Sequence, residues 1–115
     1  MREPIDVIRD TEYFSDLGES ALAEMAEACQ YVELNRGEVL FEEGEAAESF
    51  YILAYGRLGL WSGRRRVGEV HPKECIGEVA LLRDRNRTET VKAERDCLLL
   101  QLTKKSFESL LENYP

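Results

Sequence analysis

The spacing of hydrophobic positions predicts helices at both ends of the chain and strands between them. A short first helix is expected near Pro4, and an amphipathic helix follows between residues 18 and 30. There the apolar residues recur at positions i, i+3, i+4 and i+7, as Leu22, Met25, Ala26 and Cys29. The same spacing returns after Thr103, a suitable N-cap, as Phe107, Leu110, Leu111 and Tyr114. We therefore expect a helical N-terminus over residues 1–30 and a C-terminal helix over residues 103–115.

Residues 31–102 follow a different pattern, in which short β-like runs alternate with glycine-containing turns. The predicted strands cover residues 31–34, 39–42, 49–54, 57–62, 65–70, 91–94 and 98–102. Many short strands with regular glycine punctuation are typical of a β-sandwich or barrel. The expected fold is mainly β, a jelly-roll-like barrel or double-stranded β-helix with flanking helices and a short internal helix. At 115 residues the chain suits one domain and is too short for two, so a single domain is predicted over residues 1–115.

Composition narrows the function classes. The formal net charge is −8, whereas nucleic acids are bound through basic patches, so we expect no nucleic-acid partner. No apolar run approaches the length of a membrane span and no signal-peptide pattern opens the chain, so no membrane span is predicted. Cys29, Cys75 and Cys97 are odd in number and lack C-x-x-C spacing, which favours reduced, buried thiols and a cytoplasmic location. The three arginines at residues 64–66 are interpreted as a solvated hairpin tip.

The stretch from Gly77 to Val91 carries the candidate chemistry. Gly77 stands where the backbone needs a positive φ or approaches a ligand closely, and helix-forming residues follow it. The N–H groups at a helix start favour anions, and Arg87 adds a planar cation that suits phosphate. Glu78 would repel a phosphate, but it makes sense if it accepts hydrogen bonds from a sugar hydroxyl. An anion site, an arginine and a carboxylate that accepts hydrogen bonds from a sugar hydroxyl together indicate a ribose phosphate.

The same stretch resembles the phosphate-binding cassette of the cyclic nucleotide-binding domain family, and the resemblance covers nearly the whole chain from about Phe14 onward. The matching residues are Gly77, Glu78, Val79, Ala80, Arg87, Thr88, Thr90 and Val91. The resemblance implies that Glu78 holds the ribose 2′-hydroxyl and that Arg87 holds the exocyclic phosphate oxygens. It also implies that backbone N–H groups near Ala80 and Thr88 complete the phosphate cradle.

One position departs from the family pattern, because Glu89 stands where the family usually has alanine. Strand alternation would place Glu89 on the inward face with Val91 and Ala93. At roughly 5 Å from a phosphate and an effective dielectric constant of about 20, its repulsion would amount to about 3 kcal/mol. Arg87 offers a comparable attraction, so Glu89 either weakens the nucleotide or closes the pocket by pairing with Arg87. The candidate ligand-binding residues are Gly77, Glu78, Val79, Ala80, Arg87, Thr88 and Glu89.

The leading hypothesis is a regulatory sensor domain that binds a cyclic nucleotide, cAMP or cGMP, without chemistry and without a required cofactor. Its occupancy would be transmitted to an effector domain or partner protein through movement of the flanking helices. By the resemblance, Thr88 leans weakly toward cGMP. The alternative is a degenerate domain of the same fold that binds no nucleotide and serves as a structural or interaction module, which Glu89 favours.

An enzyme is not expected. His71 is the only histidine, so it would have to serve every histidine-based metal site or nucleophile–base pair. The family commonly adds a further C-terminal helix that covers the base, and none follows Pro115. The chain is therefore expected to be either a fragment of a longer protein or a stand-alone binding module.

Overall fold

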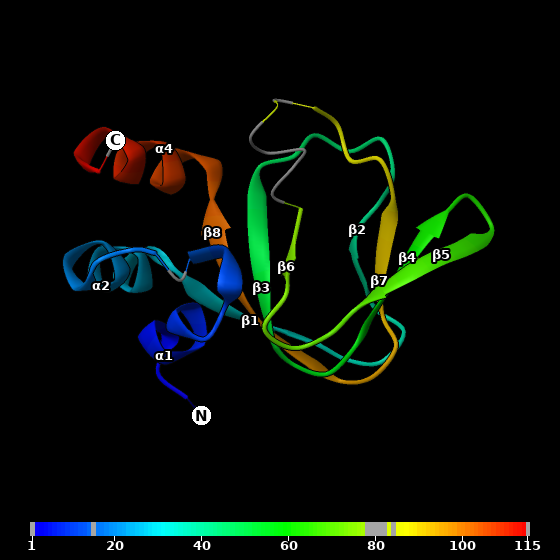
Figure 1. The fold of residues 1–115 in the computed structure, drawn as a ribbon. Helices are drawn as coiled ribbons and strands as arrows, with labels where there is room; N and C mark the ends of the chain where they lie inside the picture. Colours follow the sequence, from blue (N-terminus) through cyan, green and yellow to red (C-terminus); the bar gives the residue numbers. More distant parts are fainter. Residues whose placement is uncertain (1, 15, 78–82, 84, 115) are drawn as a thin grey trace.

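The computed structural model describes residues 2–14, 16–77, 83 and 85–114 (Figure 1). Its helices are α1 (Pro4–Arg9), the 3₁₀ helix η1 (Glu12–Phe14), α2 (Glu19–Ala28) and α4 (Lys104–Asn113). The helices predicted near Pro4, within residues 18–30 and after Thr103 are all present. Thr103 caps α4 as expected, since its hydroxyl accepts a hydrogen bond from the Ser106 N–H at 3.2 Å. The internal helix predicted after Gly77 falls on residues 78–82, outside the described residues. Within the described ranges, no helix combines the length and apolar character that a bilayer crossing requires.

The described strands form two antiparallel sheets of four strands each. They are β1 (Gln30–Leu34), β2 (Val39–Phe41), β3 (Ser49–Tyr55), β4 (Leu58–Ser62), β5 (Arg65–Val70), β6 (Cys75–Ile76), β7 (Thr90–Ala93) and β8 (Cys97–Thr103). The first sheet has the order β1-β8-β3-β6 and the second sheet has the order β2-β7-β4-β5. The predicted fold class, mainly β with flanking helices, is confirmed, and its strands lie in two sheets rather than in one closed barrel. β6 is missing from the prediction because its two residues are ordered by pairing with Tyr51 and Ile52 of β3.

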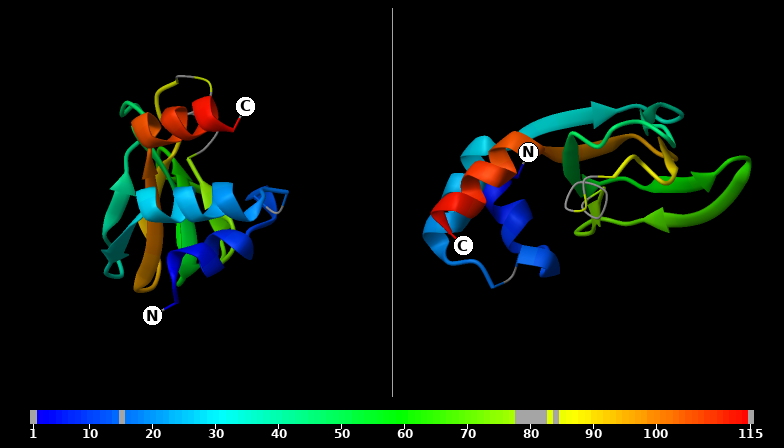
Figure 2. Two further views of the ribbon diagram at one scale, coloured as in Figure 1. Left: turned by 90° about the vertical axis from the view of Figure 1, so that its left-hand side faces the viewer. Right: turned by 90° about the horizontal axis from the view of Figure 1, so that it is seen from above.

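The first sheet is buried on both faces, so its central strands β3 and β8 are apolar almost without interruption. One face packs against α1, α2 and α4, which lie together on that side of the sheet (Figure 2). The main residues of this core are Val7, Ile8, Leu22, Met25, Phe50, Ile52, Leu100, Leu102 and Leu110. The opposite face looks toward the second sheet and contributes Tyr51, Leu53, Cys97 and Leu99 to a second core.

The second sheet is buried on one face only, and its strands alternate accordingly. In β7, Val91 and Ala93 are buried in the second core, whereas Thr90 and Lys92 are only half-buried. The hairpin of β4 and β5 projects from the body on the side away from the helices (Figure 2). The outer face of this sheet therefore faces solvent.

The turn between β5 and β6 holds a lysine in an unusual conformation. The Glu74 N–H donates to the backbone oxygen of His71 at 3.1 Å, which closes a four-residue turn. Pro72 takes the second position and Lys73, with a φ of 78°, takes the third, as a type II turn requires. A side chain at positive φ is strained, so this turn would accept glycine more readily than lysine.

Candidate functional site

Arg87 is the charged residue at the centre of the candidate site. It is 5% exposed. Its Nη1 donates to the backbone oxygen of Gly77 at 2.9 Å, and its Nη2 donates to the backbone oxygen of Ser49. The guanidinium carbon lies 4.0 Å from the ring centroid of Phe41, within the range of a cation–π interaction. Because Ser49 belongs to the first sheet and Phe41 to the second, these contacts fix the guanidinium between the two sheets.

The backbone around Arg87 is held by the turn that follows β2. The Arg87 N–H donates to the Glu45 oxygen at 2.7 Å, and the Arg87 oxygen accepts from the Gly44 N–H at 2.8 Å. Three residues after Arg87, the Thr90 hydroxyl accepts a hydrogen bond from the Glu43 N–H at 3.0 Å. Gly44 has a φ of 92°, a conformation that glycine adopts without strain, so its position in this turn has a physical reason. The second half of the predicted cassette is therefore anchored by residues far away in the sequence.

Gly77 meets one of the two alternatives that the sequence suggested for it, a positive φ. Its φ is 89°, in the left-handed region that glycine tolerates. A Cβ atom added at Gly77 would collide with the guanidinium of Arg87. The glycine thus allows the backbone to approach the arginine closely enough for its carbonyl oxygen to accept the Nη1 hydrogen bond.

Two polar side chains of the first sheet lie beside Arg87. Ser49 is 4% exposed, and its hydroxyl accepts a hydrogen bond from Nε2 of Gln101 at 2.9 Å. Tyr51 stacks on Phe41, with 6.3 Å between ring centroids. Burial raises the pKa of Tyr51, and the positive charge of Arg87 opposes that rise. The hydroxyl is therefore neutral at physiological pH and remains a hydrogen-bond donor.

The structure brings together only part of the predicted ligand-binding set. Gly77 and Arg87 are in direct contact, Thr88 is exposed and Glu89 is half-buried. Glu78, Val79 and Ala80 lie outside the described residues. β7 begins at Thr90, so Glu89 precedes the strand whose alternation was expected to orient it. Among the described residues no ion pair joins Glu89 to Arg87.

Three contributors to the site were not found from the sequence. Phe41, Ser49 and Tyr51 support or flank the guanidinium, yet they belong to β2 and β3, far from the cassette in the chain. Their sequence context marks them only as strand residues. The pairing of the residue 44–46 turn with residues 86–87 brings Phe41 to Arg87, and no local pattern reports that pairing.

His71 and Cys29 are among the groups that enzyme chemistry could use. Within the described residues, no cluster of histidine, cysteine and carboxylate side chains could hold a metal ion. His71 is exposed and pairs with Glu69, with 2.8 Å between Nε2 and Oε2. Burial raises the pKa of the half-buried Cys29 to about 12, so its thiol is neutral at physiological pH.

Most of the chain matches a known protein family. The family model described as "Cyclic nucleotide-binding domain" matches residues 31–114. The chain belongs to the cyclic nucleotide-binding domain family. The match includes both halves of the cassette together with β1 to β8, and the resemblance stated from the sequence is confirmed.

The relatives of this domain include proteins that are much longer than this chain, and one of them is a regulatory subunit. The lysophospholipase NTE1 of Chaetomium globosum is 30% identical over 119 residues, which cover 99% of this chain and 8% of that protein. The regulatory subunit of cAMP-dependent protein kinase from Candida albicans is 27% identical, over 92% of this chain and 23% of that protein. The chain therefore spans less than a quarter of the length of these relatives.

A solved structure of the same kind has its ligand bound. The regulatory domain of Toxoplasma gondii PKA, crystallised with cAMP, superposes with a TM-score of 0.86 at 28% identity. The match covers 94% of this chain and 43% of that one. The domain thus resembles regulatory, non-catalytic modules, and its likeness to a lysophospholipase is confined to 8% of that enzyme.

Proposed function

We propose that residues 1–115 form one regulatory domain that binds cAMP or cGMP and transmits its occupancy to an effector domain or partner protein. The observation that carries this proposal is Arg87, a buried guanidinium fixed by the carbonyl oxygens of Gly77 and Ser49 and stacked on Phe41. A planar cation that is already held in place suits an exocyclic phosphate, because little side-chain entropy remains to be lost on binding. Membership of the family supports the same ligand class.

The proposed roles follow the two halves of the cassette. Arg87 binds the phosphate oxygens, and Glu78 accepts hydrogen bonds from the ribose 2′-hydroxyl. Backbone N–H groups near Ala80 and Thr88 complete the phosphate cradle, with Gly77 and Val79 shaping the approach. No cofactor and no reaction are needed, since binding itself is the signal.

A short path of contacts supports signalling from this site to α4. Arg87 donates to the backbone oxygen of Ser49, and the neighbouring Glu48 oxygen accepts the Lys104 N–H at 2.8 Å. Lys104 is the first residue of α4, which packs against α2. A ligand that repositions Arg87 would therefore act on the segment that anchors α4, and would shift an existing equilibrium between helix positions. A cytoplasmic location fits such a sensor, as do its three free cysteines.

A second candidate function rests on Glu89. This half-buried carboxylate lies two residues from Arg87 and would repel a bound phosphate. If that repulsion prevails, the domain is a structural or interaction module that keeps the family fold without its ligand. Glu89→Ala distinguishes the two functions, because removing the carboxylate raises nucleotide affinity only in a pocket that admits nucleotide.

Calorimetric titration of the purified chain tests the proposal. The ligands are cAMP, cGMP and, as a control for the cyclic phosphate, 5′-AMP. We expect a Kd of about 10 μM or tighter for one cyclic nucleotide, abolished by Arg87→Ala and improved by Glu89→Ala. No heat with either cyclic nucleotide at millimolar concentration, in wild type and in Glu89→Ala alike, would contradict a sensor function and favour the interaction module.

A further inference from the structure

A second group of cations lies on the outer face of the second sheet, away from the cassette. A cleft of about 540 Å³ opens there. Its charged lining consists of Arg36, Arg57, Arg66, Lys92, Glu69 and Glu94. Four cations against two carboxylates leave an excess of two positive charges, in a chain whose formal net charge is −8. We call this feature the outer cleft.

Glu94 organises two of these arginines. Its Oε1 accepts from Nε of Arg57 at 3.1 Å and from Nη2 of Arg66 at 2.7 Å, while its Oε2 accepts from Nε of Arg66 at 2.8 Å. Gly59, in the central strand β4, leaves room for this carboxylate, because a Cβ atom there would collide with it. Arg66, followed by Arg57, lowers the pKa of Glu94, so the carboxylate remains ionised at neutral pH. The arginines are thus held close together on the sheet surface.

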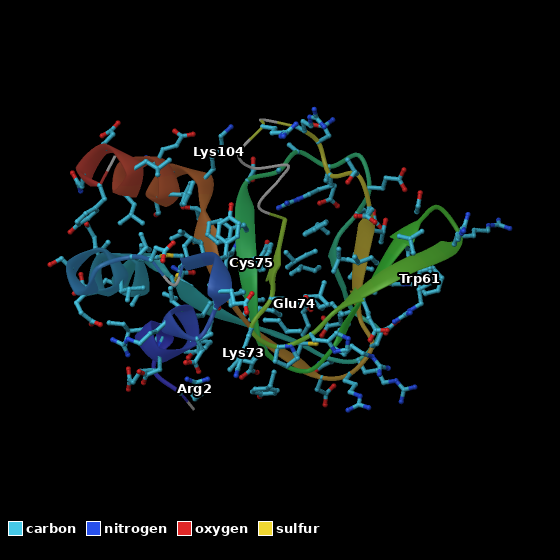
Figure 3. All side chains as sticks on the ribbon, viewed as in Figure 1. Arg2, Trp61, Lys73, Glu74, Cys75 and Lys104 are labelled. Carbon is cyan, nitrogen blue, oxygen red and sulfur yellow. The ribbon has the colours of Figure 1, made fainter. Side chains whose placement is uncertain are left out.

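The other two cations of the outer cleft have no such partner. Nζ of Lys92 lies 4.6 Å from the ring centroid of Trp61. No ion pair engages the Lys92 or Arg36 side chain within the part of the chain that the structure describes. Trp61 also lines the outer cleft, and its buried Nε1–H has no hydrogen-bond acceptor among the described residues. Figure 3 places Trp61 on the projecting hairpin, on the side opposite the helices.

We propose that the outer cleft binds an acidic peptide segment of a partner protein, with peptide carboxylates contacting Arg36 and Lys92 and the peptide covering Trp61. The charge of the cleft is complementary to such a segment. β5 lies at the edge of the second sheet and contributes Arg66 and Glu69 to the cleft. An edge strand can pair with an extended peptide through backbone hydrogen bonds, which a small anion does not use.

This proposal is independent of nucleotide binding. Lys92 and Glu94 border the outer cleft, whereas Val91, which precedes Lys92 in the chain, faces the core between the sheets. Arg87 does not line the outer cleft. A partner could therefore occupy the outer face of the sheet while the cassette is empty or filled.

Trp61 provides a direct readout, because it is the only tryptophan of the chain. The probe is the decapeptide (Glu-Ser)₅, titrated while tryptophan fluorescence is recorded, with (Gln-Ser)₅ as the uncharged control. We expect saturable binding of the acidic peptide alone. Arg36→Gln combined with Lys92→Gln should weaken it by about tenfold or more, since both proposed carboxylate contacts are lost.

The matched control removes the same amount of charge from the β4–β5 hairpin, outside the cleft. Arg64→Gln combined with Arg65→Gln changes two exposed residues that do not line the outer cleft, and affinity should stay within about threefold. Equal losses in the two double variants would overturn the proposal, since they would indicate nonspecific attraction. It would also be overturned by an absence of peptide binding at millimolar concentration. Displacement of the peptide by inorganic phosphate more than by chloride at equal ionic strength, or binding of phosphatidylserine vesicles in its place, would overturn it as well.

Discussion

The two sheets of this domain share the core that lies between them and differ in how their other faces are covered. The first sheet is covered on both faces, and β3 and β8 are apolar along nearly their whole length. The second sheet is covered on one face, and β4, β5 and β7 carry charged or aromatic residues on the other. The first sheet therefore contributes to two cores, whereas the second sheet leaves its outer face open to solvent.

The arginines between the sheets and on the outer face also differ in their hydrogen-bond partners. Between the sheets, Arg87 donates to the backbone oxygens of Gly77 and Ser49 and stacks on Phe41. On the outer face, Arg57 and Arg66 bond the ionised carboxylate of Glu94. The carbonyl oxygens of Gly77 and Ser49 orient the Arg87 guanidinium, whereas the carboxylate of Glu94 holds Arg66 on the sheet surface. We assign the proposed anionic ligand to Arg87 and a structural role to Arg66.

Truncation in the first sheet should have the largest effect. Leu100 is 1% exposed and lies in the core between β8 and the helices. Leu100→Ala should lower the free energy of unfolding by about 2–5 kcal/mol, because it removes buried contacts and leaves a cavity. Lys92→Ala on the outer face of the second sheet is the control and should cost less than about 1 kcal/mol. Similar losses in urea unfolding would refute the distinction between the sheets.

Gly59→Ala is expected to destabilise the second sheet by about 1–3 kcal/mol. Alanine in a strand ordinarily gains stability over glycine, so the sign of the change is informative. The new Cβ would displace the Glu94 carboxylate, and the two arginines would lose their common partner. In the Glu94→Ala background, the same Gly59→Ala change should be neutral or stabilising. An equal loss in both backgrounds would show that the strain lies elsewhere.

The pH dependence of stability tests the ion pairs of Glu94. The pKa of this carboxyl is lowered in the folded state, chiefly by Arg66. Its contribution is therefore complete above the unfolded pKa, near 4.5, and is lost as the pH falls through the lower folded value. Glu94→Gln should reduce the free energy of unfolding by about 1 kcal/mol at pH 7 and by much less at pH 3. A difference that does not change with pH would exclude an electrostatic origin.

The smallest expected effect concerns the turn at Lys73. Glycine relieves the positive φ of this residue but loses more backbone entropy on folding, so Lys73→Gly should raise the free energy of unfolding by at most about 1 kcal/mol. Lys73→Ala removes the same charge and keeps the Cβ, so it should bring no gain. If the alanine variant gained as much as the glycine variant, charge rather than backbone strain would be the cause.

The sequence predicted what depends on local patterns. Helical periodicity, strand alternation and the Thr103 cap predicted the elements, and the cassette motif placed Gly77 and Arg87 in one candidate site, where the structure shows them in contact. What it missed depends on pairing between distant segments. Phe41 and Ser49 meet Arg87 only because the sheets face each other.

The outer cleft was missed for a similar reason. The sequence grouped Arg66 with Arg64 and Arg65 as a solvated hairpin tip. In the structure, a register shift between Leu60 and Trp61 places Arg66 opposite Trp61. From there its side chain donates to the carboxylate of Glu94, which follows β7. A run of three arginines does not reveal which of them turns back onto the sheet. Tertiary pairing decides that.

The most direct test of the account compares the two kinds of arginine in one assay. The affinity for cAMP and cGMP would be measured by calorimetry for the wild type, Arg87→Lys and Arg66→Lys, since lysine keeps the charge and removes the planar fork. We predict a loss of about tenfold or more for Arg87→Lys and a change within about twofold for Arg66→Lys. Nucleotide binding that survives Arg87→Lys unchanged, or falls equally in both variants, would contradict the assignment of the ligand to Arg87.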